Sequence, residues 1–390
     1  MKKFYFLALM MLMALSAKAS EPEVYSVYDG DTTLTYYYDD RRSSYVGNEI
    51  AELYVSDQPH FEGYCEKIKR AVIDPSMKNA NLQSISGMFY GWSNNTLTAL
   101  KTIDGMANLV TDQVTDMQYV FCGCASLDSI DLSHFNTANV TNMQGLFASC
   151  SALKKLDMST FDTGKVQYMR FMFRGCKSLE ELDLSNFNTE AVIQMHLMFY
   201  ECKSLRSINL SSFNTANVED MNAMFEYCTA LDTLDLSNFD TRKVTNMNTM
   251  FAYCSSLKSL DISQFGPAES CDLGWMFFNC SALNSIYCYQ DWRTINSRND
   301  QAIFYGCTAI IGGRDTRYNS SWTRSGLAHV DGGSEDPGYF TTYELEEERI
   351  PTGIENVQGG NVQGTKVIEN GVLYIMYKGT MYNVQGQKVR

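Results

Sequence analysis

Positive charge is scarce in this sequence. Its 390 residues include 31 Lys and Arg against 45 Asp and Glu, which gives a formal net charge of −14. A nucleic-acid partner requires a basic surface, and anionic lipid attracts basic segments, so this balance argues against both. The chain is nonetheless 45% hydrophobic and 19% charged, a composition that can build a packed core.

Histidines are also few, and catalytic motifs are missing. The four histidines, none of which stands in a metal-binding pair, are His60, His134, His196 and His329. The sequence contains no nucleophile elbow, P-loop or dinucleotide fingerprint. We therefore expect no enzyme activity, no cofactor and no bound metal. The alternative is an exported hydrolase that acts on a carbohydrate through an acidic cleft.

No run of 18 apolar residues occurs, although a transmembrane helix needs about that length. The chain opens with two lysines, an apolar run from Phe4 to Leu15, and small residues at Ala17 and Ala19. This pattern predicts a signal peptide over residues 1–19. We expect an exported protein at the cell surface or secreted, with the periplasm as the alternative location.

A repeat of 26 residues dominates the middle of the chain. We expect about nine copies between residues 84 and 310, the first of them irregular, with Trp92 in the cysteine position. The cysteines of the repeat are Cys124, Cys150, Cys176, Cys202, Cys228, Cys254, Cys280 and, one residue late, Cys307. The phenylalanines three residues before them run from Phe121 to Phe277, and a methionine column runs from Met117 to Met247. Units of this size bury their apolar faces by stacking as a solenoid.

Each repeat reads as a strand, a turn and a short helix. Leu156 and Met158 stand two residues apart, the period of a strand. An Asn-Thr or Asp-Thr pair follows, which favours a turn or a helix cap. The next apolar residues have the spacing of one helical face: Val166, Met169, Met172, Phe173 and Cys176. The sequence therefore predicts an α/β solenoid whose strands pair in parallel.

The pattern LxxLDLSxFNTxxVTNMxxMFxxC resembles the repeat of the BspA-like bacterial surface proteins, a divergent branch of leucine-rich repeats. The segments TLTYYYDDRRSS and VIDPSM resemble the N-terminal cap that precedes such repeats in Bacteroidetes proteins. The resemblance implies a leucine-rich-repeat-like stack of coils in an exported, cell-surface binding protein, in some members an adhesin.

The tail after the repeats has a different composition. Its last part has three short β-like runs separated by Asn370-Gly371 and Lys378-Gly379, both turn signals. The ending resembles the C-terminal sorting tail of Bacteroidetes proteins at Tyr382, Asn383, Gly386 and Val389. We expect six segments: a signal peptide (1–19), a β-rich N-terminal cap (20–83), the solenoid (84–310), a C-terminal cap (311–343), a linker (344–365) and a small β tail (366–390).

Twelve cysteines in an exported chain suggest disulfides by default. Side chains in one column of a solenoid point the same way, however, so they neither face one another nor converge on a metal. We predict that the repeated cysteines are small, buried apolar residues, as free cysteine often is. The repeated methionines receive the same interpretation. Four cysteines stand outside the column, and their oxidation state stays open: Cys65, Cys122, Cys271 and Cys288.

Two surfaces are candidates for ligand binding. The first is an acidic strip on the strands, formed by Asp131, Asp157, Asp183, Asn209, Asp235 and Asp261. A serine follows each of these residues two positions later, so the strip reads either as a hydrogen-bonded stacking network or as a concave site for a basic partner or a cation. The second candidate is a set of exposed aromatic anchors at Tyr200, Tyr227 and Tyr253.

We expect a monomeric protein that binds a protein partner, from a host or from a bacterial surface, through one face of the solenoid. If the acidic strip makes this contact, binding is expected to be weak, spread over several coils and sensitive to salt. A purely structural surface spacer is a further alternative.

Overall fold

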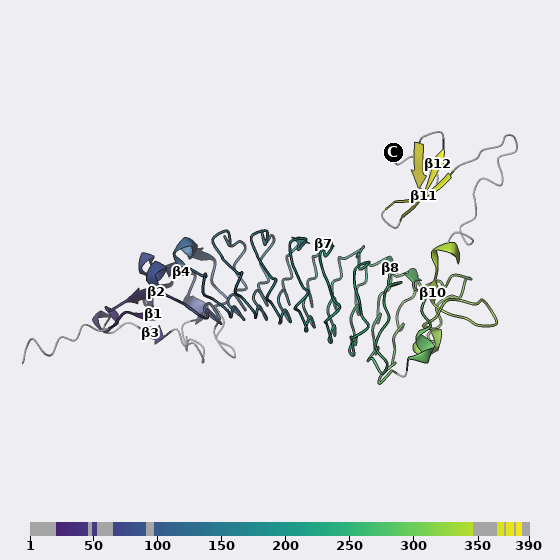
Figure 1. Ribbon diagram of the computed structural model, residues 1–390, viewed down its shortest axis with the longest axis horizontal. Helices are drawn as coiled ribbons and strands as arrows, with labels where there is room; N and C mark the ends of the chain where they lie inside the picture. Colours follow the sequence, from purple (N-terminus) through teal and green to yellow (C-terminus); the bar gives the residue numbers. More distant parts are fainter. Residues whose placement is uncertain are drawn as a thin grey trace, which may run out of the picture.

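The computed structural model describes most of the chain, and Figure 1 shows it as a long row of stacked coils. The predicted signal peptide, His60, Trp92, Gly386 and Val389 lie outside the described residues. The described ranges are 21–45, 49–52, 65–90, 97–295, 297–345, 365–369, 372–377 and 380–383.

A five-stranded sheet forms the N-terminal end of the stack, in the order β3-β1-β2-β4-β5. Its first strands are antiparallel, whereas β4 pairs in parallel with both β2 and β5. The sheet therefore passes from a hairpin into the parallel stacking of the coils. The strands are β1 (Glu23–Tyr28), β2 (Thr33–Asp39), β3 (Glu49–Glu52), β4 (Arg70–Ile73) and β5 (Thr102–Asp104).

Short 3-10 helices lie in the connections and at both ends of the stack. They are η1 (Arg42–Ser44), η2 (Cys65–Lys67), η3 (Pro75–Asn79), η4 (Met106–Asn108), η5 (Trp292–Thr294) and η6 (Ser325–Leu327). The N-terminus of η3 is capped by the carboxylate of Asp74, which accepts the Ser76 N–H at 2.9 Å.

One wall of each coil is the extended segment that contains the Leu-Asp-Leu motif. In some coils it forms short parallel strands, namely β6 (Glu181–Asp183) with β7 (Ser207–Asn209), and β8 (Ser259–Asp261) with β9 (Ser285–Tyr287) and β10 (Phe340–Thr341). The equivalent segments at 129–131, 155–157 and 233–235 are not strands. The expected parallel sheet therefore exists in separate pieces.

The opposite wall is a stack of turns, and the prediction of a short helix there is wrong. No α-helix occurs in residues 97–295 or 297–313. Within one coil, alternate N–H groups instead donate to the next coil at 2.7 to 3.2 Å: Met169 to Gln194, Phe171 to His196, Phe173 to Met198 and Gly175 to Tyr200. Of the N–H groups between them, those of Met172 and Arg174 donate to the carbonyl three residues earlier, at Met169 and Phe171.

Backbone conformation explains why the turns replace a helix. Each coil has two residues with positive φ in this segment, such as Phe171 at 61° and Gly175 at 73°. A right-handed helix cannot include such residues. Apolar steps of three fit a helix and a chain of three-residue turns equally well. Here the turns leave half of the N–H groups free to bond to the neighbouring coil.

The Asx-Thr pair joins neighbouring coils through a buried hydroxyl. Thr163 Oγ1 donates to the Asn188 carbonyl at 2.9 Å and accepts the Asn188 N–H at 2.8 Å. The side chain of Asp162 accepts the Gly164 N–H at 3.0 Å, which fixes the turn. The same bridge recurs at Thr111, Thr137, Thr189 and Thr215.

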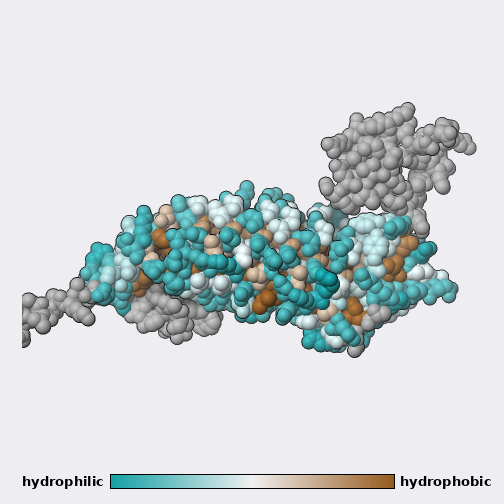
Figure 2. All heavy atoms as spheres, viewed as in Figure 1, coloured by the Kyte–Doolittle hydropathy of each residue, from teal (hydrophilic) through white to brown (hydrophobic). Residues whose placement is uncertain are grey.

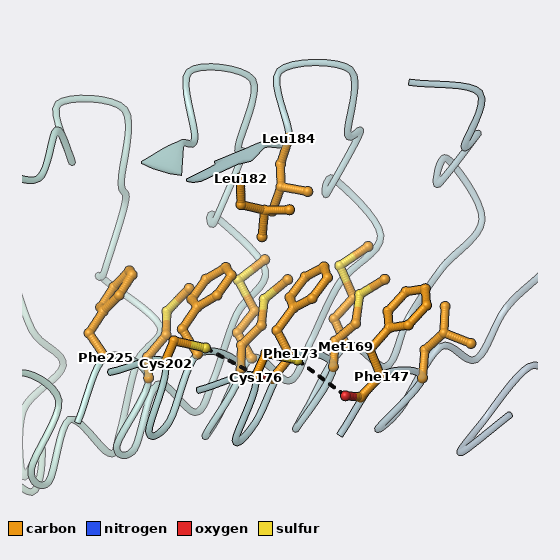
Figure 3. Packing of buried hydrophobic residues seen from close by; sticks show 14 of the residues in the cluster. Phe147, Met169, Phe173, Cys176, Leu182, Leu184, Cys202 and Phe225 are labelled. Atoms are coloured by element: carbon orange, nitrogen blue, oxygen red, sulfur yellow. Dashed lines mark hydrogen bonds between the residues drawn. The ribbon is translucent and has the colours of Figure 1, made fainter. Parts of the chain in front are cut away.

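The core between the two walls is a column of stacked phenylalanines, seen in Figure 3 together with Leu182 and Leu184, which reach it from the opposite wall. From Phe89 to Phe304, successive ring centroids are 5.4 to 5.9 Å apart and nearly parallel. The methionines of the repeat are buried beside them. The prediction that these methionines belong to the core is confirmed.

Aromatic residues cover both ends of this column. At the N-terminal end, the buried Tyr36 packs edge-on against Phe89 with ring centroids 5.4 Å apart, and its hydroxyl donates to the Met88 carbonyl. At the C-terminal end, Tyr339 packs edge-on against Phe304 at 5.1 Å. The last rings are therefore not left open to water, which would forfeit part of their burial energy.

A separate three-stranded antiparallel sheet lies in the tail. It consists of β11 (Thr365–Glu369), β12 (Val372–Tyr377) and β13 (Thr380–Asn383), which occupy the three runs that the two turn signals separate. In the described part of the chain, no helix has the length and apolar character needed to span a bilayer.

Candidate binding surfaces

The cysteine column is buried, as the sequence predicted, and its thiols are free. Each thiol also has a task that the sequence did not indicate. The thiol of Cys176 donates to the Phe147 carbonyl at 3.2 Å, a group that also accepts the Cys150 N–H at 3.1 Å. Figure 3 shows this bond and the equivalent one from Cys202 to Phe173. The thiol thus satisfies the second lone pair of a buried carbonyl.

This environment removes the cysteines from nucleophilic chemistry. Burial raises the pKa of Cys176 to about 12, so the thiol stays protonated at physiological pH. Outside the column, Cys65, Cys271 and Cys288 are buried and Cys122 is half-buried. In the described residues, no three His, Cys, Asp or Glu side chains lie close enough together to hold a metal ion.

The acidic strip lies on the outer side of the strand wall. Asp183, between the buried Leu182 and Leu184 of the strand wall, is exposed, and its Oδ1 accepts the Ser185 N–H at 3.0 Å. All six members make this bond to the serine two residues later, at 2.9 to 3.2 Å: Asp131, Asp157, Asp183, Asn209, Asp235 and Asp261. One oxygen of each side chain therefore fixes the local turn.

The serine bonds also lower the pKa of three of these carboxylates. The side-chain hydroxyl and then the N–H of Ser159 hold the pKa of Asp157 below its ordinary value, and Ser133 does the same for Asp131. For Asp183 the backbone N–H of Ser185 is the largest cause of the lowered pKa. At the end of the strip, Asp261 accepts the hydroxyl of Tyr343 at 2.6 Å.

A row of aromatic side chains lies on the outer side of the turn wall. We call it the aromatic ridge, and it consists of Tyr200, Tyr227, Tyr253, Phe278 and Tyr305. The rings of Tyr227 and Tyr253 stack with centroids 4.3 Å apart, and the other neighbours are 5.3 to 5.8 Å apart. The three tyrosines predicted as anchors are half-buried and form one surface with the half-buried Phe278 and the exposed Tyr305.

Cations flank the ridge at its N-terminal end. The guanidinium carbon of Arg174 lies 5.4 Å from the ring centroid of Tyr200, and Lys203 Nζ lies 5.8 Å from that of Tyr227. Burial, followed by a hydrogen bond with Tyr253, raises the pKa of Tyr227 to about 12, so the Tyr227 hydroxyl stays neutral at physiological pH. The ridge therefore offers neutral aromatic rings with positive charge along one end.

The backbone at the stacked tyrosines is left-handed, as it is at this position in the neighbouring coils, including at Ser149 and Glu201. Tyr227 and Tyr253 both have φ of 62°, a conformation that bulky residues rarely adopt. In earlier coils, the same column carries Gly123 and Gly175, which adopt positive φ without strain. Two successive coils therefore hold an aromatic side chain where glycine would be the less costly choice.

A hollow of about 430 Å³ lies on the same outer wall, nearer the N-terminus. We call it the outer hollow. The sequence analysis did not predict this hollow. Small residues stand there at repeat positions that carry aromatic residues in other coils, and this difference is visible in the sequence. Its lining residues are Tyr90, Thr98, Tyr119, Cys122, Gly123, Ala125, Ala148, Ser149, Phe171 and Arg174.

Comparison with known families identifies the repeat region. The family model described as a Mycoplasma protein of unknown function, DUF285, matches residues 83–209 and 198–313. These two matches together cover more than half of the chain. The chain belongs to the DUF285 family. The matched region of this DUF285 protein is the region where the 26-residue period occurs, so a repeat family is shown, whereas a Bacteroidetes origin and a sorting role for the tail stay predictions.

No curated protein matches the DUF285 chain in sequence. Among solved structures, it is similar to a chain in the crystal structure of a TLR13–ssRNA13 complex, at 16% identity and a TM-score of 0.28. That match covers 63% of this chain, which spans about a third (35%) of the length of the TLR13-complex chain.

Proposed function

We propose that this DUF285 protein is an exported, non-catalytic binding protein that docks a protein partner on the aromatic ridge. The observation that carries the proposal is the stacked pair Tyr227 and Tyr253, held half-exposed in a left-handed backbone conformation. The same column carries Gly, Ser or Glu in earlier coils, so the stack itself does not require an aromatic pair at this outer position. Tyrosine is also enriched among the residues that dominate binding energy at protein interfaces.

The acidic strip supports partner binding less well than the ridge. Each of its members already uses one oxygen to accept a serine N–H, which is a structural task. At Asp261 the other oxygen accepts the Tyr343 hydroxyl, and exposed charges contribute little to affinity although they steer approach. In this proposal the strip sets the charge of one wall, and the ridge makes the contact.

Export rests on the sequence pattern of residues 1–19 and on the resemblance of the tail to a sorting signal. We propose delivery to the cell surface or secretion, and an adhesin-like role toward a host or bacterial surface protein. Deletion of residues 366–390 is then expected to leave the solenoid folded but to change where the protein accumulates. Fractionation of cells that express the full and the shortened chain tests this, and unchanged surface delivery would reject the sorting role.

Binding is tested with the full chain lacking residues 1–19, labelled with a fluorophore and applied to host epithelial cells and to bacterial cells. The key variant is Tyr227→Gly combined with Tyr253→Gly, because glycine occupies this column naturally at positions 123 and 175. We expect this variant to keep its fold and to lose most cell binding. Circular dichroism and a melting curve check the fold.

The matched control changes Asp157, Asp183 and Asp235 to Asn, which keeps their shape and an acceptor oxygen. Retained binding in this variant supports the ridge, whereas its loss together with a reduced salt dependence would move the contact to the acidic strip. Release of reducing sugars from a polysaccharide would favour the hydrolase alternative. Absence of binding to any of the cells would favour the structural spacer.

A further inference from the structure

The outer hollow exists because several coils depart from the pattern of their neighbours. Equivalent residues of successive coils form columns on the outer wall. In the column of Tyr200 and Phe278, the hollow is lined by Cys122 and Ala148. In the column of Tyr227 and Tyr253, it has Gly123 and Ser149. The backbone ladder is the same along the stack, so the missing side chains leave a space where the ridge would otherwise continue.

Aromatic rings remain on the walls of this space. Tyr90 and Tyr119 lie with ring centroids 5.7 Å apart at an interplanar angle of 32°, and Phe171 lies two coils beyond Tyr119. Gly145 stands between Tyr119 and Phe171 in their column, and a Cβ there would lie only 2.4 Å from the Tyr119 ring. The glycine therefore allows the Tyr119 ring to lie against the next coil.

The hollow has one charged lining residue, and it is a cation. Arg174 is exposed, and no carboxylate of the described residues lies within 4.0 Å of its guanidinium. Arg242, by contrast, pairs with Asp240 at 2.6 Å. The Arg174 guanidinium lies 5.4 Å from the ring centroid of Tyr200, so it has an aromatic neighbour but no anionic partner among the described residues.

The other polar groups of the lining do not cancel this charge. Burial raises the pKa of the half-buried Cys122 to about 12, so its thiol is neutral at physiological pH. The hydroxyls of Thr98 and Ser149 are exposed and can donate to or accept from a bound polar group. The space lies in the size range of small-molecule sites, which combine apolar walls with few polar groups.

We propose that the outer hollow binds a ring that carries a carboxylate, with the face of the ring against Tyr119 and Phe171 and the carboxylate on Arg174. The planar guanidinium forms two parallel hydrogen bonds with a carboxylate, and aromatic walls favour a flat or low-polarity ring face. A carboxylated sugar ring and a carboxylated hydrocarbon ring share this chemistry. Arg174 also lies against Tyr200 of the ridge, but the site does not require a partner to dock there.

The experiment titrates small-molecule probes against the full chain lacking residues 1–19 and monitors their binding by ligand-observed NMR. Four probes separate the contributions: methyl glucuronide, cyclohexanecarboxylate, methyl glucoside and acetate. We expect at least one of the two ring acids to bind at least about tenfold more tightly than both the neutral sugar and acetate. The ring acid that binds more tightly identifies the source of the ring.

Two variants and one control place the binding in the outer hollow. Arg174→Gln is expected to weaken binding of the ring acid at least about tenfold. Ser149→Tyr puts into the hollow the residue that Tyr227 and Tyr253 carry at the same positive φ, and should abolish binding without unfolding the chain. Arg206→Gln, an exposed arginine outside the hollow, is the matched control and should bind as the parent does.

Equal binding of all four probes, or no binding of either ring acid, would overturn the proposal. Unchanged affinity in both Arg174→Gln and Ser149→Tyr would likewise place any binding elsewhere on the chain. A melting curve of each variant separates loss of the site from loss of the fold, and the cell-binding assay of the ridge variant reports independently on partner docking.

Discussion

The two sides of the turn wall differ in how strictly the same residue types recur from coil to coil. Toward the core, the same residue types return in coil after coil, as in the stacked Phe173, Phe199 and Phe225. Toward solvent, one repeat position is Gly145 in one coil, Phe171 in the next and Leu197 in the coil after that, with the same backbone conformation. Figure 2 shows a mainly hydrophilic surface with separate apolar patches along the stack.

The difference shows which residues the stacking constrains. An inward side chain contacts its copies in the coils before and after it, so any change alters two interfaces. An outward side chain is constrained only by the backbone, which makes its inter-coil hydrogen bonds whatever residue is present. Binding surfaces can therefore vary on the outer side without cost to the ladder. The following predictions set inner changes against outer ones.

The largest effect is expected for Phe199→Ala. Phe199 is fully buried, with ring centroids 5.6 Å from Phe173 and 5.4 Å from Phe225. Truncation opens a cavity in the column and should lower the free energy of unfolding by about 3–5 kcal/mol. Urea denaturation measures this, and an unchanged midpoint would mean that the column does not stabilise the stack.

A smaller loss is expected for Cys202→Ala. The change removes a buried sulfur and its 3.2 Å hydrogen bond to the Phe173 carbonyl, and should cost about 1–3 kcal/mol. Cys202→Ser retains a donor, so we expect it to differ from Cys202→Ala in the same denaturation experiment. The native thiols should also resist a thiol reagent until the chain unfolds, because they are buried and protonated.

Outer changes are expected to cost much less. Tyr200→Ala, next to Phe199 in sequence but half-exposed, should change the free energy of unfolding by less than about 1 kcal/mol. Tyr227→Gly loses a ring contact but relieves a backbone with φ of 62°, so the two effects oppose each other. If Tyr200→Ala destabilised the chain as strongly as Phe199→Ala, the two sides would not differ in the way described.

The smallest effect concerns pH and the acidic strip. The pKa values of Asp131, Asp157 and Asp183 are lowered in the folded chain. Their contribution to stability is therefore present above the unfolded-state pKa of about 3.9 and is lost as the pH falls through the folded values. Changing all three to Asn should leave stability at pH 7 nearly unchanged, since Asn209 accepts the same bond at 3.2 Å, and should flatten the acid limb of a melting-temperature curve.

The sequence indicated the period, the core columns and the buried cysteines correctly, because each depends on a spacing that is visible along the chain. It did not indicate the turn wall, since Met169, Met172 and Cys176 have three-residue steps in a helix and in a chain of turns alike. Nor did it indicate the task of the threonine at the Asx-Thr pair, whose hydroxyl bonds to a residue 25 positions later. The Asp-Ser pairs were readable as local hydrogen bonds, and the structure forms them.

By itself the sequence determined that this chain must stack, since one repeat cannot bury its own Leu, Met and Phe. Only the tertiary structure decided how the stack is bonded. Alternate N–H groups of the turn wall and the column thiols donate to carbonyls in another coil, an arrangement that depends on the two left-handed residues per turn segment. The outer hollow was decided in the same way, because small residues such as Ala148 and Ser149 form a space only when coils 26 residues apart lie side by side.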